Sequence, residues 1–350
     1  MTKKAEQVIV GISIGDLNGI GSEVVLKTFE DTRMLEFCTP VIFANVKLMS
    51  FIKKTLGLND INLHGIDRLD QMVHGKINVL NVWKEGVNIE FGVVNDNIGK
   101  YAIKSFTEAT AALKEGSVDV LVTAPINKYN VQSEEFKFPG HTDYLNQEIE
   151  GDALMLMVHD NLRIGLLTDH LPVNDVASHL TEELIRTKLI TVNNALKQDF
   201  MINSPKIAML CLNPHCGDNG VIGDEDDKLL KPALKKLFEE GVHVFGPFSA
   251  DGFFGNGLYE KYDAVIASYH DQGLVPFKTL AFGNGVNYTA GLTKIRTSPD
   301  HGTAYDIAGK GEADFNSFKE AVYLALDIFN NRIQYSEMTS NPLKVKEKQL

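Results

Sequence analysis

The sequence predicts an α/β protein with a largely parallel sheet. Short apolar runs rich in Val and Ile alternate with helical patterns along most of the 350 residues, which is typical of strands that are buried on both faces and joined by helices. The length corresponds to about two domains of roughly 150 residues. No internal repeat and no low-complexity linker divides the chain. We therefore expect two intertwined lobes, with crossings between them.

The predicted strands are short apolar runs. The first, VIVGISI, follows two lysines and superficially resembles a signal peptide. It is short, it ends in Gly-Asp and no small-residue cleavage site follows it, so a buried strand is the better prediction. The predicted strands cover residues 8–14, 40–44, 77–82, 118–124, 153–158, 162–168, 206–212, 242–248 and 263–269.

Helical spacing appears between these runs. Apolar residues recur at intervals of three or four over 102–113 and again over 185–196, which places each set on one face of a helix. Thr181 is the predicted N-cap of the second of these helices. Ser317 and Glu320 have the spacing of a capping box ahead of a further apolar helix.

The composition excludes several classes of protein. Lys and Arg number 34 and Asp and Glu 46, for a net charge of −12. An acidic chain without a basic block is a poor binder of nucleic acid or membrane surfaces. No apolar stretch approaches the length of a membrane span. The three cysteines form neither a disulfide framework nor a paired zinc motif, which favours a cytoplasmic protein.

Three histidines lie just past the carboxyl ends of predicted strands: His170, His215 and His270. Ligands bind at that edge of open α/β sheets, and three neutral imidazoles would leave a divalent metal with open positions for a substrate. Each histidine alone could instead satisfy a loop hydrogen bond. His159 also follows a strand-like run, but the HDN sequence there predicts a tight turn.

The segment that follows His270 is Gly-rich and is predicted to be a long loop. It carries Lys278, Asn287 and Arg296 with few acidic residues before Asp300. Arg and Lys beside a metal favour an anionic substrate, because they bind phosphate or carboxylate. The alternative is a set of surface charges, but long loops in compact domains are more often functional.

The sequence GISIGDLNGIGSE at residues 11–23 takes a buried strand into a helix through three glycines. Glycines and a helix N-terminus can cradle an anion. The glycine spacing does not match a dinucleotide fingerprint. A tight strand–helix turn and a ligand site therefore remain equally open.

These residues together resemble the PdxA family of 4-hydroxythreonine-4-phosphate dehydrogenases, which act in vitamin B6 biosynthesis. The resemblance covers nearly the whole chain. One departure is LNG in the first motif, where PAG is commoner in the family. The matching segments are GDLNGIGSE, TAPINK, PGHTDYL, LLTDHLP, LNPHCGDNG, SYHDQGL and FGNGVNYTAGLTKIRTSPDHGTA.

The resemblance implies a fold similar to isocitrate and isopropylmalate dehydrogenases, with two α/β lobes and the active site in the cleft between them. It also implies a homodimer whose interface helps to build the active site, so that a metal ligand could come from the partner. Residues 1–340 would form one catalytic unit, with 1–128 and 302–335 in lobe one, 129–301 in lobe two, and 336–350 as a polar tail that frays from about Tyr335.

The family's functional residues fall on named positions of this chain. Its metal ligands fall on the same three histidines, and its substrate contacts on His141, Thr142, Lys278, Asn287 and Arg296. The segment 301–311 resembles the nucleotide-binding loop of the decarboxylating dehydrogenases. By that analogy His301, Gly302, Thr303 and Ala304 would border the adenosine of the cofactor, and Asp306 would bond its ribose and favour NAD over NADP. Alternatively, this segment caps a helix that begins near Thr303.

The reaction that the family implies is oxidation of 4-phosphooxy-L-threonine to a β-keto acid, which then loses carbon dioxide. A metal would lower the pKa of the substrate alcohol, and NAD would accept the hydride. The candidates for the base are Lys278, Asp251 and Asp271, and the residues do not choose among them. Zinc suits three imidazoles best, although magnesium, cobalt, nickel and manganese remain open.

Three other functions compete with this prediction. A paralogous enzyme would oxidise 4-phosphothreonate or 4-phosphoerythronate with the same metal and phosphate groups. A zinc hydrolase would use the three histidines to activate water. The third alternative is a non-catalytic binding protein that kept the cleft. NADH formation with each phosphorylated acid separates the paralogous dehydrogenases, and strict dependence on NAD would exclude the hydrolase.

Overall fold

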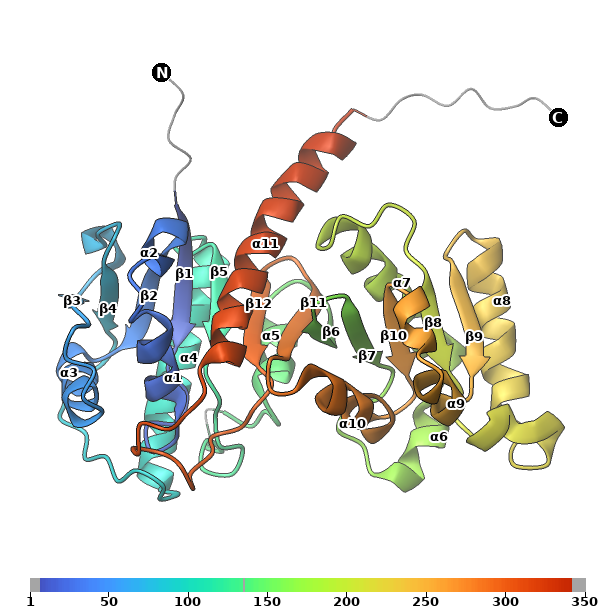
Figure 1. The fold of residues 1–350 in the computed structure, drawn as a ribbon, viewed down its shortest axis with the longest axis horizontal. Helices are drawn as coiled ribbons and strands as arrows, with labels where there is room; N and C mark the ends of the chain where they lie inside the picture. The colour runs from blue at the N-terminus through green and yellow to red at the C-terminus, as the bar shows by residue number, and fades with distance from the viewer. Residues whose placement is uncertain (1–6, 135, 342–350) are drawn as a thin grey trace.

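The computed structural model describes residues 7–134 and 136–341 as an α/β fold around one twelve-stranded sheet (Figure 1). The order of strands is β3-β4-β2-β1-β5-β12-β11-β6-β7-β10-β8-β9. The strands are β1 (Val8–Ser13), β2 (Cys38–Ala44), β3 (Leu63–Ile66), β4 (Ile77–Asn81), β5 (Val120–Thr123), β6 (Gly151–His159), β7 (Leu162–Leu166), β8 (Ile207–Leu210), β9 (Val244–Phe248), β10 (Ala264–Ala267), β11 (Val286–Leu292) and β12 (Ile295–Pro299).

The sheet is largely parallel, as the sequence predicts. The antiparallel pairs are β12–β11, β11–β6 and β6–β7, which follow one another in the middle of the sheet. The pairs on either side of them are parallel. Each of the nine predicted strands is present. The predicted tight turn after His159 is also confirmed, because β6 and β7 form a hairpin there.

Helices cover both faces of the sheet, and α11 runs across its middle in Figure 1. The predicted cap of α7 is confirmed, because the Thr181 hydroxyl accepts a hydrogen bond from the Leu184 N–H at 3.1 Å. The helices are α1 (Gly21–Thr28), α2 (Met34–Phe37), α3 (Val46–Thr55), α4 (Asp96–Glu115), α5 (His141–Glu148), α6 (Val176–His179), α7 (Glu182–Gln198), α8 (Lys231–Glu239), α9 (Ala250–Gly255), α10 (His270–Ala281) and α11 (Asn316–Thr339).

The predicted long loop after His270 is wrong up to Pro299, and apart from short turns only residues 300–315 of this segment lie outside helices and strands. The segment forms α10 and the two central strands β11 and β12. Two of its glycines, Gly285 and Gly291, lie beside or within β11 where a side chain would not fit. A Cβ on Gly285 would lie 2.5 Å from the Asp300 carboxylate, and one on Gly291 would lie 2.2 Å from the Asp152 carbonyl. Tertiary packing therefore overrides the local propensity of glycine.

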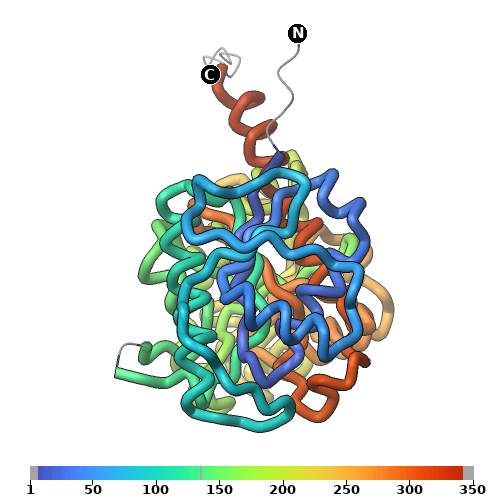
Figure 2. Tube along the Cα trace, turned by 90° about the vertical axis from the view of Figure 1, so that its left-hand side faces the viewer, coloured from blue at the N-terminus to red at the C-terminus, as the bar shows by residue number. Residues whose placement is uncertain are grey.

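Two predictions about the last helix are also corrected. Ser317 does not cap α11; its hydroxyl donates to the Gly285 carbonyl at 2.6 Å and accepts from the Asp300 N–H at 3.1 Å. The helix does not fray at Tyr335 but continues to Thr339, and its last turns project beyond the body (Figure 2). The end of the predicted tail, residues 342–350, lies outside the described residues.

The glycine segment at residues 11–23 is a tight turn. A Cβ on Gly15 would lie 2.2 Å from the Pro125 carbonyl, and one on Gly19 would lie 2.8 Å from the Thr303 carbonyl. The backbone from Gly15 to Gly21 is buried against these neighbours. The glycines are therefore needed for close approach of backbone to backbone, and Gly19 lets the chain at Thr303 lie against the turn that leads into α1.

One hydrophobic cluster extends from β1 and α1 through α11 to β8 and α8. The core is thus continuous along the sheet. Because this cluster marks no division between two lobes, the predicted lobe boundaries stay a prediction. No helix within 7–134 and 136–341 is both long enough and apolar enough to cross a membrane.

Candidate active site

A cavity of about 260 Å³ opens beside the carboxyl ends of β5, β7, β10 and β12. This is the edge at which the strand-end histidines predict a ligand site. All five predicted substrate residues line it, together with two of the three predicted metal ligands. The lining includes Thr123, Lys128, His141, Thr142, Asp143, His170, His270, Lys278, Asn287, Arg296, Asp300, His301 and Gly302.

Arg296 on β12 is the buried cation of the cavity, with 3% of its surface exposed. Its Nε and Nη2 donate to the Thr123 hydroxyl at 3.0 and 2.7 Å, and its Nη1 donates to the Thr289 hydroxyl at 3.1 Å. Burial lowers the pKa of Arg296 to about 9. Among the described residues no carboxylate forms an ion pair with it, so an anion in the cavity would supply the missing negative charge.

His141, at the start of α5, faces the same guanidinium. Its Nδ1 lies 3.1 Å from Nη2 of Arg296, and a guanidinium can only donate, so Nδ1 accepts and Nε2 carries the proton. Burial, followed by the charges of Arg296 and Lys128, holds the pKa of His141 well below 6.5. His141 is therefore a neutral donor. Its Nε2 and the Oδ1 of Asn287 are buried without a hydrogen-bond partner among the described residues.

Two lysines add positive charge to the cavity. Nζ of Lys278 on α10 donates to the Asp300 carbonyl at 2.8 Å, and Nζ of Lys128 lies 3.2 Å from Nε2 of His170. Sequence reasoning missed Lys128, although it stands in the TAPINK motif. Its position could have identified it, because Lys128 lies just past the carboxyl end of β5, as His170 and His270 lie just past the ends of β7 and β10.

His170 and His270 lie side by side because β7 and β10 are neighbouring strands. Their ring centroids are 5.9 Å apart. Nδ1 of His270 contacts the Asp271 carboxylate at 2.7 Å, which leaves its Nε2 for another ligand. Burial, aided by Lys128, lowers the pKa of His170 and favours the neutral imidazole that a metal requires. The fold thus brings two imidazoles together at this edge of the sheet.

His215 does not join that pair. It begins a run of left-handed backbone after β8, with φ of 53° at His215 and 54° at Cys216. It does not line the cavity. Within the described residues no three His, Cys, Asp or Glu side chains are arranged to hold a metal. The predicted convergence of three histidines is therefore absent from the single chain, and only two of them meet.

The three candidate bases occupy different places. Lys278 lines the cavity, whereas Asp251 and Asp271 do not. The Asp271 side chain is 79% exposed and pairs with His270. Asp251 accepts a hydrogen bond from the Ser249 hydroxyl at 2.6 Å, which lowers the pKa of the carboxyl and makes it a weaker base.

The predicted cofactor segment borders the cavity at one end. His301 and Gly302 line the cavity, and Nε2 of His301 is buried without a partner among the described residues. Thr303 faces β1–α1, where its carbonyl accepts a hydrogen bond from the Ile20 N–H at 3.0 Å. Asp306 is exposed, and Ala304 adopts a φ of 42°. No helix begins near Thr303, because the chain forms turns until α11.

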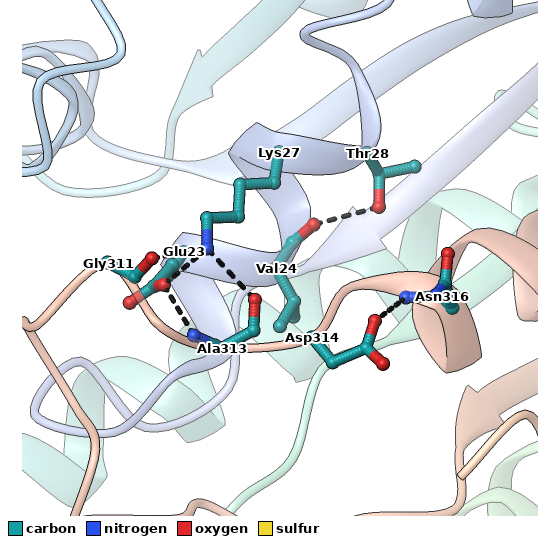
Figure 3. A network of polar contacts seen from close by, with 8 residues as sticks. All are labelled: Glu23, Val24, Lys27, Thr28, Gly311, Ala313, Asp314 and Asn316. Atoms are coloured by element: carbon teal, nitrogen blue, oxygen red, sulfur yellow. Dashed lines mark hydrogen bonds and ion pairs between the residues drawn. The ribbon is translucent and has the colours of Figure 1, made fainter. Parts of the chain in front are cut away.

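The far end of this segment is fastened to α1, as Figure 3 shows. Lys27 donates to the carbonyls of Gly311 and Ala313 at 2.8 and 2.9 Å, and it pairs with Glu23 at 2.9 Å. The Glu23 carboxylate also accepts from the Ala313 N–H at 2.9 Å. Because Glu23 is only 2% exposed, this ion pair is shielded from water.

Residues 36–325 match the model of the family described as pyridoxal phosphate biosynthetic protein PdxA. The chain belongs to the PdxA family. The protein is thus an oxidoreductase that acts on a hydroxyl group, as its relatives' names indicate. Because these relatives are named dehydrogenases, membership of the PdxA family argues against the alternative of a zinc hydrolase. It also agrees with the α/β fold, since solved PdxA-type dehydrogenases share the architecture.

Three relatives illustrate the breadth of the family. The 4-hydroxythreonine-4-phosphate dehydrogenase of Bacteroides thetaiotaomicron is 45% identical over 96% of this chain and 92% of its own. The solved enzyme of that name from Klebsiella pneumoniae is 32% identical, with a TM-score of 0.77 over 94% of this chain and 99% of its own. A Cutibacterium acnes protein, provisionally called D-threonate 4-phosphate dehydrogenase, is 35% identical over 91% of this chain and 93% of its own.

Proposed function

We propose that the protein oxidises the secondary alcohol of 4-phosphooxy-L-threonine with NAD, as a step of pyridoxal 5'-phosphate biosynthesis. The product is 2-amino-3-oxo-4-phosphooxybutanoate, a β-keto acid that loses carbon dioxide to give 3-amino-2-oxopropyl phosphate. Two kinds of support carry the proposal: the names of the relatives and a cavity in which cations and neutral donors face one another.

The buried guanidinium of Arg296 is the observation that carries the substrate assignment. It is held by Thr123 and Thr289, and no carboxylate neutralises it in the described part of the chain. Arg296 and Lys128 give the cavity two cations for a phosphate and a carboxylate, and Lys278 adds a third when it is protonated rather than acting as the base. His141 Nε2 would donate to an anionic oxygen, and Asn287 Oδ1 would accept from a substrate N–H or O–H.

A divalent metal, zinc by preference, would be held by His170, His215 and His270. When bound, it would act as a Lewis acid on the substrate alcohol while the nicotinamide accepts the hydride. Asp271 would orient the His270 ring through Nδ1. Lys278 is our choice for the base, because it is the one of the three candidates that lines the cavity.

We further propose that the protein is a homodimer in which the partner completes the metal site. The support is the separation of His215 from the other two histidines within one chain. A second copy with its own His170, His215 and His270 near the shared edge would supply the third imidazole. We expect metal binding to depend on dimerisation, and sedimentation of metal-loaded and metal-free protein tests this.

We place NAD along the segment 301–311, as the resemblance to the nucleotide-binding loop implies. His301 and Gly302 would meet the part of NAD nearest the cavity, with Thr303 and Ala304 further along. The exposed carboxylate of Asp306 would accept from a ribose hydroxyl and repel a 2'-phosphate. We therefore expect NAD to be preferred over NADP, and equal kcat/KM for the two cofactors would contradict this placement.

The test is NADH formation from each of three phosphorylated acids: 4-phosphooxy-L-threonine, 4-phosphothreonate and 4-phosphoerythronate. We expect the amino acid to give the highest kcat/KM. The second candidate is oxidation of 4-phosphothreonate, which the 35% identical Cutibacterium acnes relative favours. A higher kcat/KM for that acid would replace the first proposal with the second.

A further inference from the structure

Asp16 is a fully buried carboxylate in the glycine segment, with 0% of its surface exposed. Its Oδ1 accepts from the Asn18 N–H at 2.9 Å. Its Oδ2 accepts two further hydrogen bonds, from Asn130 Nδ2 at 2.7 Å and from the Tyr305 hydroxyl at 3.0 Å. No Lys or Arg pairs with it among the described residues. A buried charge that is balanced only by dipoles is costly to keep.

Two of the three hydrogen bonds to Asp16 come from distant segments, and we call each of them a branch. The first branch is Tyr305, which belongs to the cofactor segment and lies between Ala304 and Asp306. Burial raises the pKa of Tyr305 to about 12, so its hydroxyl stays protonated and donates to Asp16. The neighbouring Thr303 carbonyl is bonded to the Ile20 N–H. The near end of the cofactor segment is thus fixed to the glycine segment, as its far end is fixed to α1.

The second branch is Asn130, in the turn that follows β5 and carries Lys128. The Asn130 amide also donates to the Asn95 carbonyl at 3.3 Å. Its own carbonyl lies against α4, where a Cβ on Gly99 would come within 1.9 Å of it. Two residues before it, Lys128 reaches into the cavity beside His170. The position of Lys128 therefore depends on the same carboxylate as that of Tyr305.

We propose that Asp16 is a positioning residue that sets the cofactor segment and the Lys128 turn relative to each other. It touches neither substrate nor cofactor, and it acts through Tyr305 on one side and Asn130 on the other. The role of the 301–311 segment in this inference rests on the proposed function. Misplacement of a reacting group by about 1 Å can cost about a hundredfold in rate, so one shared anchor has a large effect.

The two branches can be cut separately. Tyr305→Phe removes only the hydroxyl, and we expect the dissociation constant of NADH, measured by fluorescence titration, to rise about fivefold while the KM for the phosphorylated substrate stays within twofold. Asn130→Ala cuts the other branch, and we expect the substrate KM to rise about tenfold while NADH binding is unchanged. Asp16→Asn should impair both. A fivefold to tenfold change is the size expected from the net contribution of one typical intramolecular hydrogen bond.

Tyr323→Phe is the matched control, because Tyr323 on α11 packs against Phe37 and lies outside the cavity. Thermal melting identifies any variant that fails to fold. If Asn130→Ala fails to fold, the result for Tyr305→Phe alone decides whether the inference holds. Unchanged NADH affinity in Tyr305→Phe, or equal changes of both constants in either single variant, would overturn the inference. NADH binding without turnover of any phosphorylated acid would remove the proposed function, and the inference would then be decided by the NADH dissociation constants of Tyr305→Phe and Asp16→Asn.

Discussion

The two sides of the cavity differ in how completely they are built. On one side Arg296 is buried and held by Thr123, Thr289 and His141 through hydrogen bonds of 2.7 to 3.1 Å. On the other side His170 and His270 are partly exposed, with side chains that are 46% and 40% accessible. The third histidine lies on a separate loop, outside the cavity.

The difference indicates two ways to make a binding site. The anion side is preorganised: folding has already buried a guanidinium without an acidic partner, so an incoming anion recovers part of that cost. The histidine side brings only two imidazoles together. A metal bound there would need further ligands from outside the pair. If the partner supplies one, metal binding is coupled to dimerisation.

The largest effect is expected from the histidines. His270→Ala removes a ligand from the preformed pair, and His215→Ala removes the distant one; each should lower kcat/KM by about a thousandfold, since a metal contributes several kcal/mol. Metal content by mass spectrometry, compared with His159→Ala as a control, checks the result. Full metal content in His215→Ala would mean that the site consists of His170 and His270 without it.

Arg296→Met should lower kcat/KM by about a hundredfold, because truncating one member of a buried charged contact costs about 3 kcal/mol. Arg186→Met is the control, since Arg186 pairs with Glu240 on the surface. Steady-state kinetics with the phosphorylated substrate measures the loss. If the two variants lose activity equally, the anion side is not the preorganised site described above.

Lys128→Met tests the residue at which the two sides meet. We expect about a tenfold rise in substrate KM, because a partly exposed cation contributes about 1.4 kcal/mol to the binding of an anion. Lys188→Met serves as the control; its Nζ donates to the Ala153 carbonyl at 3.0 Å, outside the cavity. A substrate KM within twofold of the wild type would mean that Lys128 contributes nothing to binding the anionic substrate and acts only on His170.

The smallest effect concerns the pH dependence of stability. The folded pKa of His141 lies well below 6.5, so at low pH the unfolded chain binds a proton there that the folded chain does not. The free energy of unfolding should therefore fall as pH drops below about 6.5, by up to ~1.4 kcal/mol per pH unit from this group. His141→Gln should show a shallower decline in urea melts at pH 8, 6 and 5. Identical slopes would contradict the neutral, buried state of His141.

Strand-end position is enough to locate His170 and His270, because the carboxyl ends of parallel strands meet at one edge of the sheet. The same reasoning places the backbone of His215 near that edge. It does not predict the direction of the side chain, because His215 begins a run of left-handed backbone. His141 and Thr142 are identified only through family resemblance, since they open a helix that is remote in sequence from the histidines. Lys128 also follows a strand, but a search for metal ligands at strand ends selects histidines and passes over lysines.

The sequence was sufficient to predict the alternation of strands and helices, the family, and the edge of the sheet where the candidate site lies. These follow from hydrophobic periodicity and from short motifs, which are local properties. The tertiary structure alone decided that the Gly-rich segment after His270 forms two central strands, that Arg296 is buried without an acidic partner, and that Asp16 joins two distant segments. Such features depend on which backbones approach each other, and that is settled only when the whole sheet is assembled.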